Sequence, residues 1–190
     1  MATLLCAALL LPAAAAGSGA SGWQGILTLR TRFEGPPDVN PPFDILVSER
    51  FFYPYTLRVN FTDQQVDREW RALYLENEYV KCAILPDLGG HLHSCLDKLS
   101  GREMFYANLS VKKRWIGPRG AWVAMGIELN FPVAHNWVSV SPVDFAVTQE
   151  AGGSASAWVG LVDRVYGMQW LVEFLLAAGQ RCAGAKSDAI

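Results

Sequence analysis

Glu128, Asn130 and His135 place a carboxylate, an amide and an imidazole within an otherwise apolar stretch of the chain. They belong to GIELNFPVAH, residues 126–135, which directly follows the apolar residues AWVAM. A carboxylate and an imidazole can act as an acid/base pair, because the pKa of each group can be tuned toward neutrality. Glu128 and His135 are therefore candidate catalytic residues, and all three side chains could hydrogen-bond the hydroxyl groups of a sugar.

The alternation of residues 121–132 predicts a strand, in which successive side chains point to opposite faces. The odd positions are all apolar and are expected to face the core, whereas the even positions carry Trp122, two small residues, Glu128 and Asn130. An aromatic ring can stack on a pyranose, small residues leave room for it, and polar groups can bind its hydroxyls. The pattern predicts one wall of a sugar-binding cleft. The alternative is a face turned to solvent or to a loop, with the polar groups bonded to the backbone.

A second wall is predicted farther along the chain, where Arg164 would share a strand face with Trp158, Gly160 and Val162. Arg164 and His135 are expected at the rim of the site. The alternative for Arg164 is a surface ion pair, which contributes little to stability.

His91 and His93 are two positions apart, so on a strand they share a face with Cys95 and Asp97. This set could bind a metal ion only with a further ligand nearby and supporting hydrogen bonds. The favoured interpretation is two exposed imidazoles beside the turn at residues 89–90. Neither a metal ion nor a cofactor is expected.

Turn residues divide the chain into short runs that alternate between apolar and polar residues. These turn residues are Asn77, Ser100-Gly101 and Gly152-Gly153. No segment shows a sustained helical period. Short strands separated by such turns predict an all-β fold, an antiparallel β-sandwich.

Length, charge and the first residues limit the classes of protein. The chain of 190 residues is long enough for one domain with a substantial core. Its formal net charge of −2 gives no concentrated positive field, so no nucleic acid partner is expected. Residues 1–20 are interpreted as a signal peptide, which predicts a secreted or periplasmic protein; the alternative is an uncleaved Ala-rich leader. No later segment is a transmembrane candidate, so no membrane association is expected after leader removal.

Three cysteines, Cys82, Cys95 and Cys182, remain once such a leader is removed. An odd number without C-x-x-C spacing predicts neither a disulfide framework nor a zinc site. Cys82 is expected to be a small buried hydrophobic residue. The alternative is a Cys82–Cys95 disulfide in an oxidising compartment.

The stretch NEYVKCAILPDLGGHLHSCLDKLSGREMFY resembles the start of a galactose-mutarotase-like β-supersandwich, where a strand, a proline, a Gly-Gly turn and a hairpin follow one another. GAWVAMGIELNFPVAH, SPVDF and WVGLVDRVYGMQWLVEFLL are similar to an uncharacterised family of such domains, which often precede tetratricopeptide repeats in bacterial proteins. The resemblance covers roughly residues 53–176. It implies a carbohydrate-binding domain, and it transfers no established catalytic residues.

The resemblance also implies that this chain is an N-terminal portion. A full supersandwich needs roughly 250 residues or more, whereas the pattern ends near Leu176. Galactose mutarotases use a histidine as acid and a late glutamate as base. This chain has no counterpart of that glutamate, so mutarotation is not expected.

The expected organisation is a signal peptide at 1–20, N-terminal strands and a Pro-rich connector at 21–52, a mutarotase-like sandwich at 53–176 and an irregular tail at 177–190. The predicted function is non-catalytic carbohydrate binding through Trp122, Glu128, Asn130, His135 and Arg164. One alternative is a sugar-processing enzyme, an epimerase or glycoside-processing protein, that uses Glu128 and His135. Another is a structural or interaction module whose unpaired strand edges recruit a further domain or subunit.

Overall fold

A computed structural model describes residues 19–38, 53–114, 116, 122–131, 135 and 138–189. Residues 1–18 of the expected leader and most of the Pro-rich connector lie outside these ranges. No helix in the described ranges is both long enough and apolar enough to cross a membrane.

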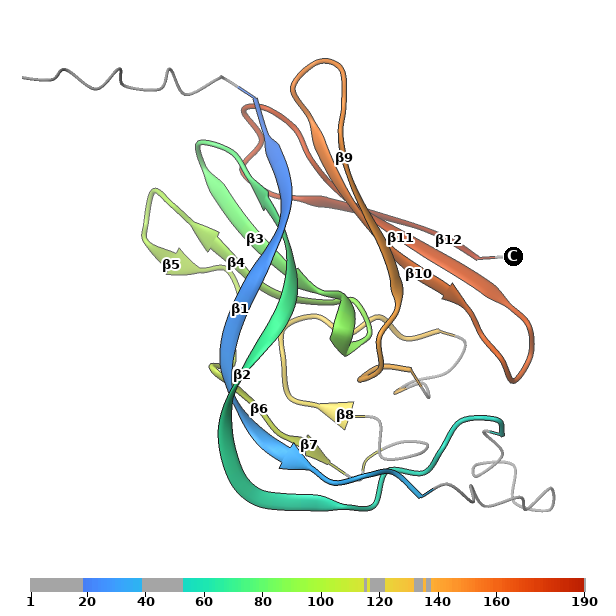
Figure 1. Cartoon of the computed structure of the whole chain (residues 1–190). Coiled ribbons are helices and arrows are strands. Elements are labelled where there is room, and N and C mark those ends of the chain that lie inside the picture. Colours follow the sequence, from blue (N-terminus) through green and yellow to red (C-terminus); the bar gives the residue numbers. More distant parts are fainter. Residues whose placement is uncertain are drawn as a thin grey trace, which may run out of the picture.

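The chain folds as an all-β sandwich, as the spacing of the turns predicts (Figure 1). The first sheet has the order β5 (Arg102–Glu103), β4 (His91–Asp97), β3 (Val80–Leu85), β2 (Phe61–Glu76), β1 (Ser21–Glu34), β6 (Ser110–Val111). The second has the order β12 (Gly184–Ala189), β11 (Gln169–Leu176), β10 (Ala155–Val162), β9 (Asp144–Gln149). A small sheet pairs β7 (Lys113–Arg114) with β8 (Trp122–Val123), and the 3-10 helix η2 (Pro86–Leu88) joins β3 to β4.

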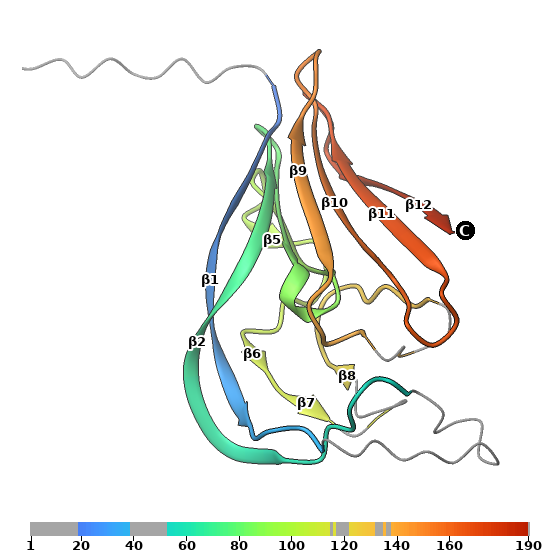
Figure 2. The same ribbon diagram turned by 45° about the vertical axis from the view of Figure 1, so that its right-hand side comes forward.

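The hydrophobic core lies between the two large sheets, which face each other in Figure 2. Side chains of β11 alternate as period two requires, so that every second residue from Trp170 to Leu176 is buried. Leu73 and Leu75 on β2 are fully buried in the same cluster. Trp170, Val172, Phe174 and Leu176 are therefore core residues.

Two expected boundaries are wrong. The N-terminal strand is not a separate element, because β1 pairs with β2 from Ser21↔Glu76 to Glu34↔Phe61. The tail expected to be irregular contains β12, which pairs with β11 from Trp170↔Ala189 to Leu175↔Gly184. An edge strand of small and polar residues is held by backbone hydrogen bonds, so it leaves no hydrophobic alternation in the sequence.

Cys82 and Cys95 form a disulfide, which corrects the expectation of a free buried thiol at Cys82. The two residues are directly opposite each other in the β3–β4 ladder, with Cα atoms 4.1 Å apart. Burial of Cys82 is confirmed, since it is 0% exposed. The disulfide was only the alternative in the sequence analysis, because the strand register that places the two cysteines opposite each other is not displayed by the sequence.

Asn77 connects the turn between β2 and β3 to the opposite sheet. Its Oδ1 accepts hydrogen bonds from the backbone N–H groups of Tyr79 and Val80, each at 2.9 Å. Its Nδ2 donates to the carbonyl oxygens of Ala177 and Gln180, between β11 and β12, at 2.9 and 2.8 Å. Because the side chain is buried, all four bonds replace hydrogen bonds to water.

We expect Asn77→Asp to lower the free energy of unfolding by about 1–3 kcal/mol, because the acceptor remains while both donated bonds between the sheets are lost. Urea unfolding measures this difference. Glu78→Gln, at the neighbouring exposed turn position, is the matched control and should leave stability unchanged. Equal stability of Asn77→Asp and the control would contradict this role.

Candidate functional site

The segment expected to be one strand at residues 121–132 is irregular, which corrects that prediction. Within its described part, only Trp122–Val123 forms a strand. Gly126 has φ 34°, in the left-handed region, and a Cβ atom there would overlap the Leu92 carbonyl oxygen. The chain therefore approaches β4 closely, and Ile127 exchanges backbone hydrogen bonds with Leu92 at 2.9 and 3.1 Å.

This turn changes which side chains face the core. Val123 and Met125 are 3% and 6% exposed, as the alternation predicts, but Ile127 is 47% exposed. Glu128 instead has a largely buried side chain, 14% exposed. The two-sided pattern is therefore interrupted at Gly126 and Ile127, although Leu129 and Phe131 are partly buried against the core.

Glu128 and His135 form a hydrogen-bonded pair. The distance from His135 Nδ1 to Glu128 Oε2 is 2.8 Å. With Glu128 ionised, Nδ1–H donates to it, and this fixes the tautomer and orientation of the imidazole. His135 Nε2 is then the ring atom that can interact with a ligand, on a side chain that is 36% exposed.

Asn130 holds the backbone of His135, a role that differs from the predicted contact with a ligand. Its Oδ1 accepts the backbone N–H of His135 at 2.7 Å. His135 has φ 48°, which is unfavourable for a residue with a side chain. Backbone strain of this kind persists where surrounding contacts enforce it, and it clusters at functional sites.

Trp122 completes this group on β8. Its ring is half-buried, and its centroid lies 6.4 Å from that of His135 in an edge-on arrangement, with 87° between the planes. Four of the five predicted residues are thus connected: Trp122, Glu128, Asn130 and His135. They are called the Glu128–His135 site below.

His91 and His93 are buried, at 0% and 3% exposure, which corrects the prediction of exposed imidazoles. Their ring nitrogens contact the carbonyl oxygens of Leu88 and Asn108, respectively. His91 Nε2, His93 Nδ1 and Glu128 Oε1 are buried without a hydrogen-bond partner. Within the described ranges, no three His, Cys, Asp or Glu side chains are grouped so as to hold a metal ion.

Electrostatics keep His91 neutral beside Glu128. Burial lowers the pKa of His91, and the neighbouring His93 lowers it further, while the Leu88 carbonyl and the Glu128 carboxylate oppose the shift. A neutral imidazole that donates through Nδ1 presents Nε2 as an acceptor. His91 Nε2 and Glu128 Oε1 are therefore two buried acceptors that call for a donor, such as a hydroxyl group or water.

Arg164 is not part of this group. β10 ends at Val162, so Arg164 lies in the exposed turn before β11, and its backbone N–H donates to the Tyr55 hydroxyl at 3.0 Å. No described contact joins it to Glu128 or His135. The prediction assumed a regular strand through residue 164, whereas the strand ends two residues earlier.

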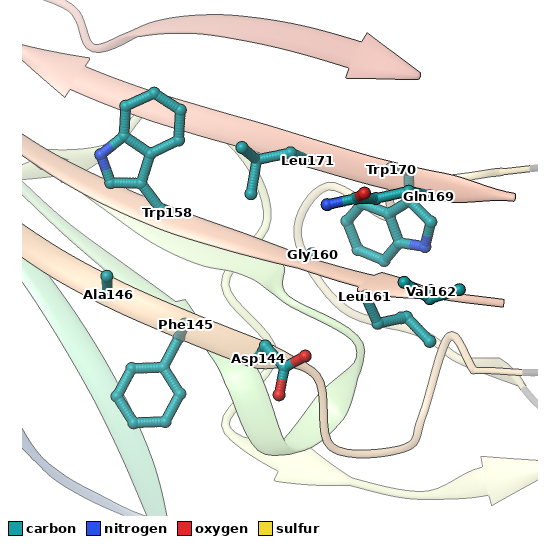
Figure 3. A pocket seen from close by; sticks show the side chains of 10 residues that line it. All are labelled: Asp144, Phe145, Ala146, Trp158, Gly160, Leu161, Val162, Gln169, Trp170 and Leu171. Carbon is teal, nitrogen blue, oxygen red and sulfur yellow. The ribbon is translucent and has the colours of Figure 1, made fainter. Parts of the chain in front are cut away.

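The predicted face around Trp158 does exist, on the outer side of the four-stranded sheet. A shallow pocket of about 200 Å³ lies over Gly160, with Trp158 and Val162 flanking it along β10 (Figure 3). Asp144 on β9 and Leu171 on β11, each paired with Gly160, form its sides. No member of the Glu128–His135 site lines this pocket.

A compact ion cluster supports β7, which is the partner strand of β8. Glu34 accepts bonds from Lys113 Nζ at 2.8 Å and from Arg58 Nη1 at 3.0 Å, and Arg58 also donates to Ser141 Oγ at 2.8 Å. Burial raises the pKa of Glu34, but the charges and hydrogen bonds of Lys113 and Arg58 lower it overall. Burial, aided by the Arg58 charge, lowers the pKa of Lys113 to about 8.

The structure thus defines an all-β sandwich domain with a carboxylate–imidazole pair held against one of its strands. Residues 48–187 match the family model described as "Domain of unknown function (DUF5107)". Because the match covers more than half of the chain, the protein belongs to this family.

One similar solved structure is a TPR-domain containing protein from Parabacteroides distasonis, 29% identical in sequence with a TM-score of 0.77. The similarity covers 89% of this chain and 29% of that protein, so the chain spans under a third of its length. Both findings are consistent with a domain family that precedes tetratricopeptide repeats, as predicted.

We expect Gly126→Ala to destabilise the protein by more than 2 kcal/mol, because the added Cβ must displace the Leu92 carbonyl as well as adopt positive φ. Gly101→Ala is the matched control, since Gly101 has φ 69° with open space around it, and its cost should be about 1 kcal/mol. Urea unfolding and hydrogen exchange at the Leu92 amide measure both effects. Equal losses of unfolding free energy in the two variants would show that the close approach of Gly126 to Leu92 does not contribute to the cost.

The pKa of Lys113 predicts a pH dependence of stability. Between about pH 8 and its ordinary pKa of 10.5, the unfolded chain binds more protons at this lysine than the folded chain. The free energy of unfolding should therefore rise with pH across this window, by up to about 3 kcal/mol relative to Lys113→Met. Urea unfolding at several pH values measures the difference, with Lys112→Met as control. Parallel pH curves for wild type and Lys113→Met would contradict it.

Proposed function

We propose that this domain binds carbohydrate at the Glu128–His135 site. The observation that carries the proposal is the hydrogen-bonded Glu128–His135 pair beside the half-buried Trp122. An aromatic ring offers a stacking surface for the C–H face of a pyranose, and the paired polar groups accept or donate to its hydroxyls. The resemblance of the sequence to galactose-mutarotase-like domains supports the same ligand class.

Rigid supports for these side chains favour selective binding. Asn130 fixes the His135 backbone, and the backbone pair of Ile127 with Leu92 fixes the position of Glu128. Groups held in place before a ligand arrives lose less entropy when they bind it. These supporting hydrogen bonds favour a binding site over a loop whose side chains only face solvent.

A second candidate function is proton transfer on a bound sugar. The 2.8 Å contact between His135 Nδ1 and Glu128 favours it, because such an orienting carboxylate is the usual partner of a catalytic imidazole. In that case Nε2 of His135 would exchange the proton with the sugar. Glu128 would be the positioning residue.

A secreted or periplasmic location is proposed with this function. The Cys82–Cys95 disulfide supports it, because disulfides persist in oxidising compartments. In such a location, the domain would meet glycans and free sugars outside the cytoplasm.

The test is calorimetric titration with a panel of neutral and acidic monosaccharides and oligosaccharides. We expect at least one sugar to bind, and Trp122→Ala and Glu128→Gln each to weaken it about tenfold or more, a loss of roughly 1.4 kcal/mol or more. Trp23→Ala is the matched control, since Trp23 stacks on Tyr74 between β1 and β2 and is 36% exposed.

The outcomes separate the candidate functions. Binding with no change in the sugar by NMR supports a binding domain. Conversion that disappears in both Glu128→Gln and His135→Ala supports the enzyme. If no sugar binds, or if binding persists when Trp122 and Glu128 are replaced together, the proposal is wrong.

A further inference from the structure

Arg114 lies beside the predicted stacking residue. The β7–β8 ladder pairs Arg114 directly with Trp122 and Lys113 directly with Val123. Directly opposed residues in an antiparallel pair share a face of the ladder. Lys113 and Val123 are buried on one face, while Arg114 and Trp122 share the other face and are both half-buried.

The charge of Arg114 is only loosely compensated. Among the described residues its one ion pair is with Asp63, at 3.9 Å, and Asp63 is 86% exposed. Asp63 already has a closer partner in Arg32, at 2.7 Å. By contrast, Lys113 on the opposite face is fully engaged by Glu34 at 2.8 Å. Arg114 is therefore the cation on this ladder that retains capacity for an anionic ligand.

Trp122 has polar neighbours from two parts of the chain. Its ring meets His135, which is bonded to Glu128, and its ladder partner is Arg114. A sugar stacked on Trp122 would thus lie near both the Glu128 carboxyl group and the Arg114 guanidinium group. A carboxylate on that sugar would be repelled from Glu128 and attracted to Arg114, and this would fix its orientation.

We infer that the ligand of this site is an acidic saccharide, a uronic acid or a chain that contains one, and that Arg114 binds its carboxylate. This inference rests on the proposed function and adds the ligand class to it. Guanidinium groups pair with carboxylates through two parallel hydrogen bonds, so Arg114 would add specificity as well as affinity.

The test compares sugars that differ only in the carboxylate. Glucuronate is titrated against glucose, and galacturonate against galactose, by calorimetry on the full chain. The wild type should bind one of the acids about tenfold more tightly than its neutral counterpart, as expected for one charge-assisted contact. Arg114→Gln should remove this preference and leave the affinity for the neutral sugar within about twofold.

Two further variants and the possible contrary outcomes decide the inference. Arg102→Gln, an exposed arginine on β5, is the matched control and should keep the preference. Asp63→Asn should keep or strengthen acid binding, because it releases Arg114. A wild type that binds neutral sugars equally well, or a preference that survives Arg114→Gln, overturns the inference while the proposed function stands. No binding of either kind overturns both.

Discussion

The close approach of Gly126 to the carbonyl oxygen of Leu92 is the constraint on which the candidate site depends. Two segments more than thirty positions apart in sequence exchange backbone hydrogen bonds at this point, through Leu92 and Ile127. The approach is possible because position 126 has no Cβ atom. It carries Glu128 to β4, next to His91, where its carboxyl group also bonds His135.

The electrostatic state of the site follows from this placement. Burial lowers the pKa of His91, and one oxygen of the neighbouring Glu128 is bonded to His135. The other oxygen is buried without a partner. An unsatisfied buried acceptor costs about 1–3 kcal/mol, so a donor from water or from a ligand hydroxyl would stabilise this arrangement.

Much of the fold and part of the site followed from the sequence, for identifiable reasons. Period-two alternation and glycine turns, such as that at Gly152-Gly153, predicted the sandwich. Both signals can be read within a short stretch of sequence, without knowledge of which strands pair. The same reasoning grouped Trp122 with Glu128 and Asn130, and His135 was added because it lies just past them in the sequence. The Cys82–Cys95 disulfide was only an alternative, and the place of Arg114 opposite Trp122 was missed, because both depend on the register between strands. It also failed at Gly126, where a tertiary contact interrupts the alternation.

Glycoside hydrolysis by Glu34 and Glu128 is disfavoured by the contacts of these two carboxyl groups. Such hydrolysis needs one carboxyl group that stays protonated as the acid and a second that is ionised. Glu34 cannot be that acid, because Lys113 and Arg58 lower its pKa overall and occupy its oxygens. One oxygen of Glu128 is occupied by its hydrogen bond to the His135 ring. Under the proposed function, these groups therefore serve recognition of a sugar, or proton exchange through His135, and not cleavage of a glycosidic bond.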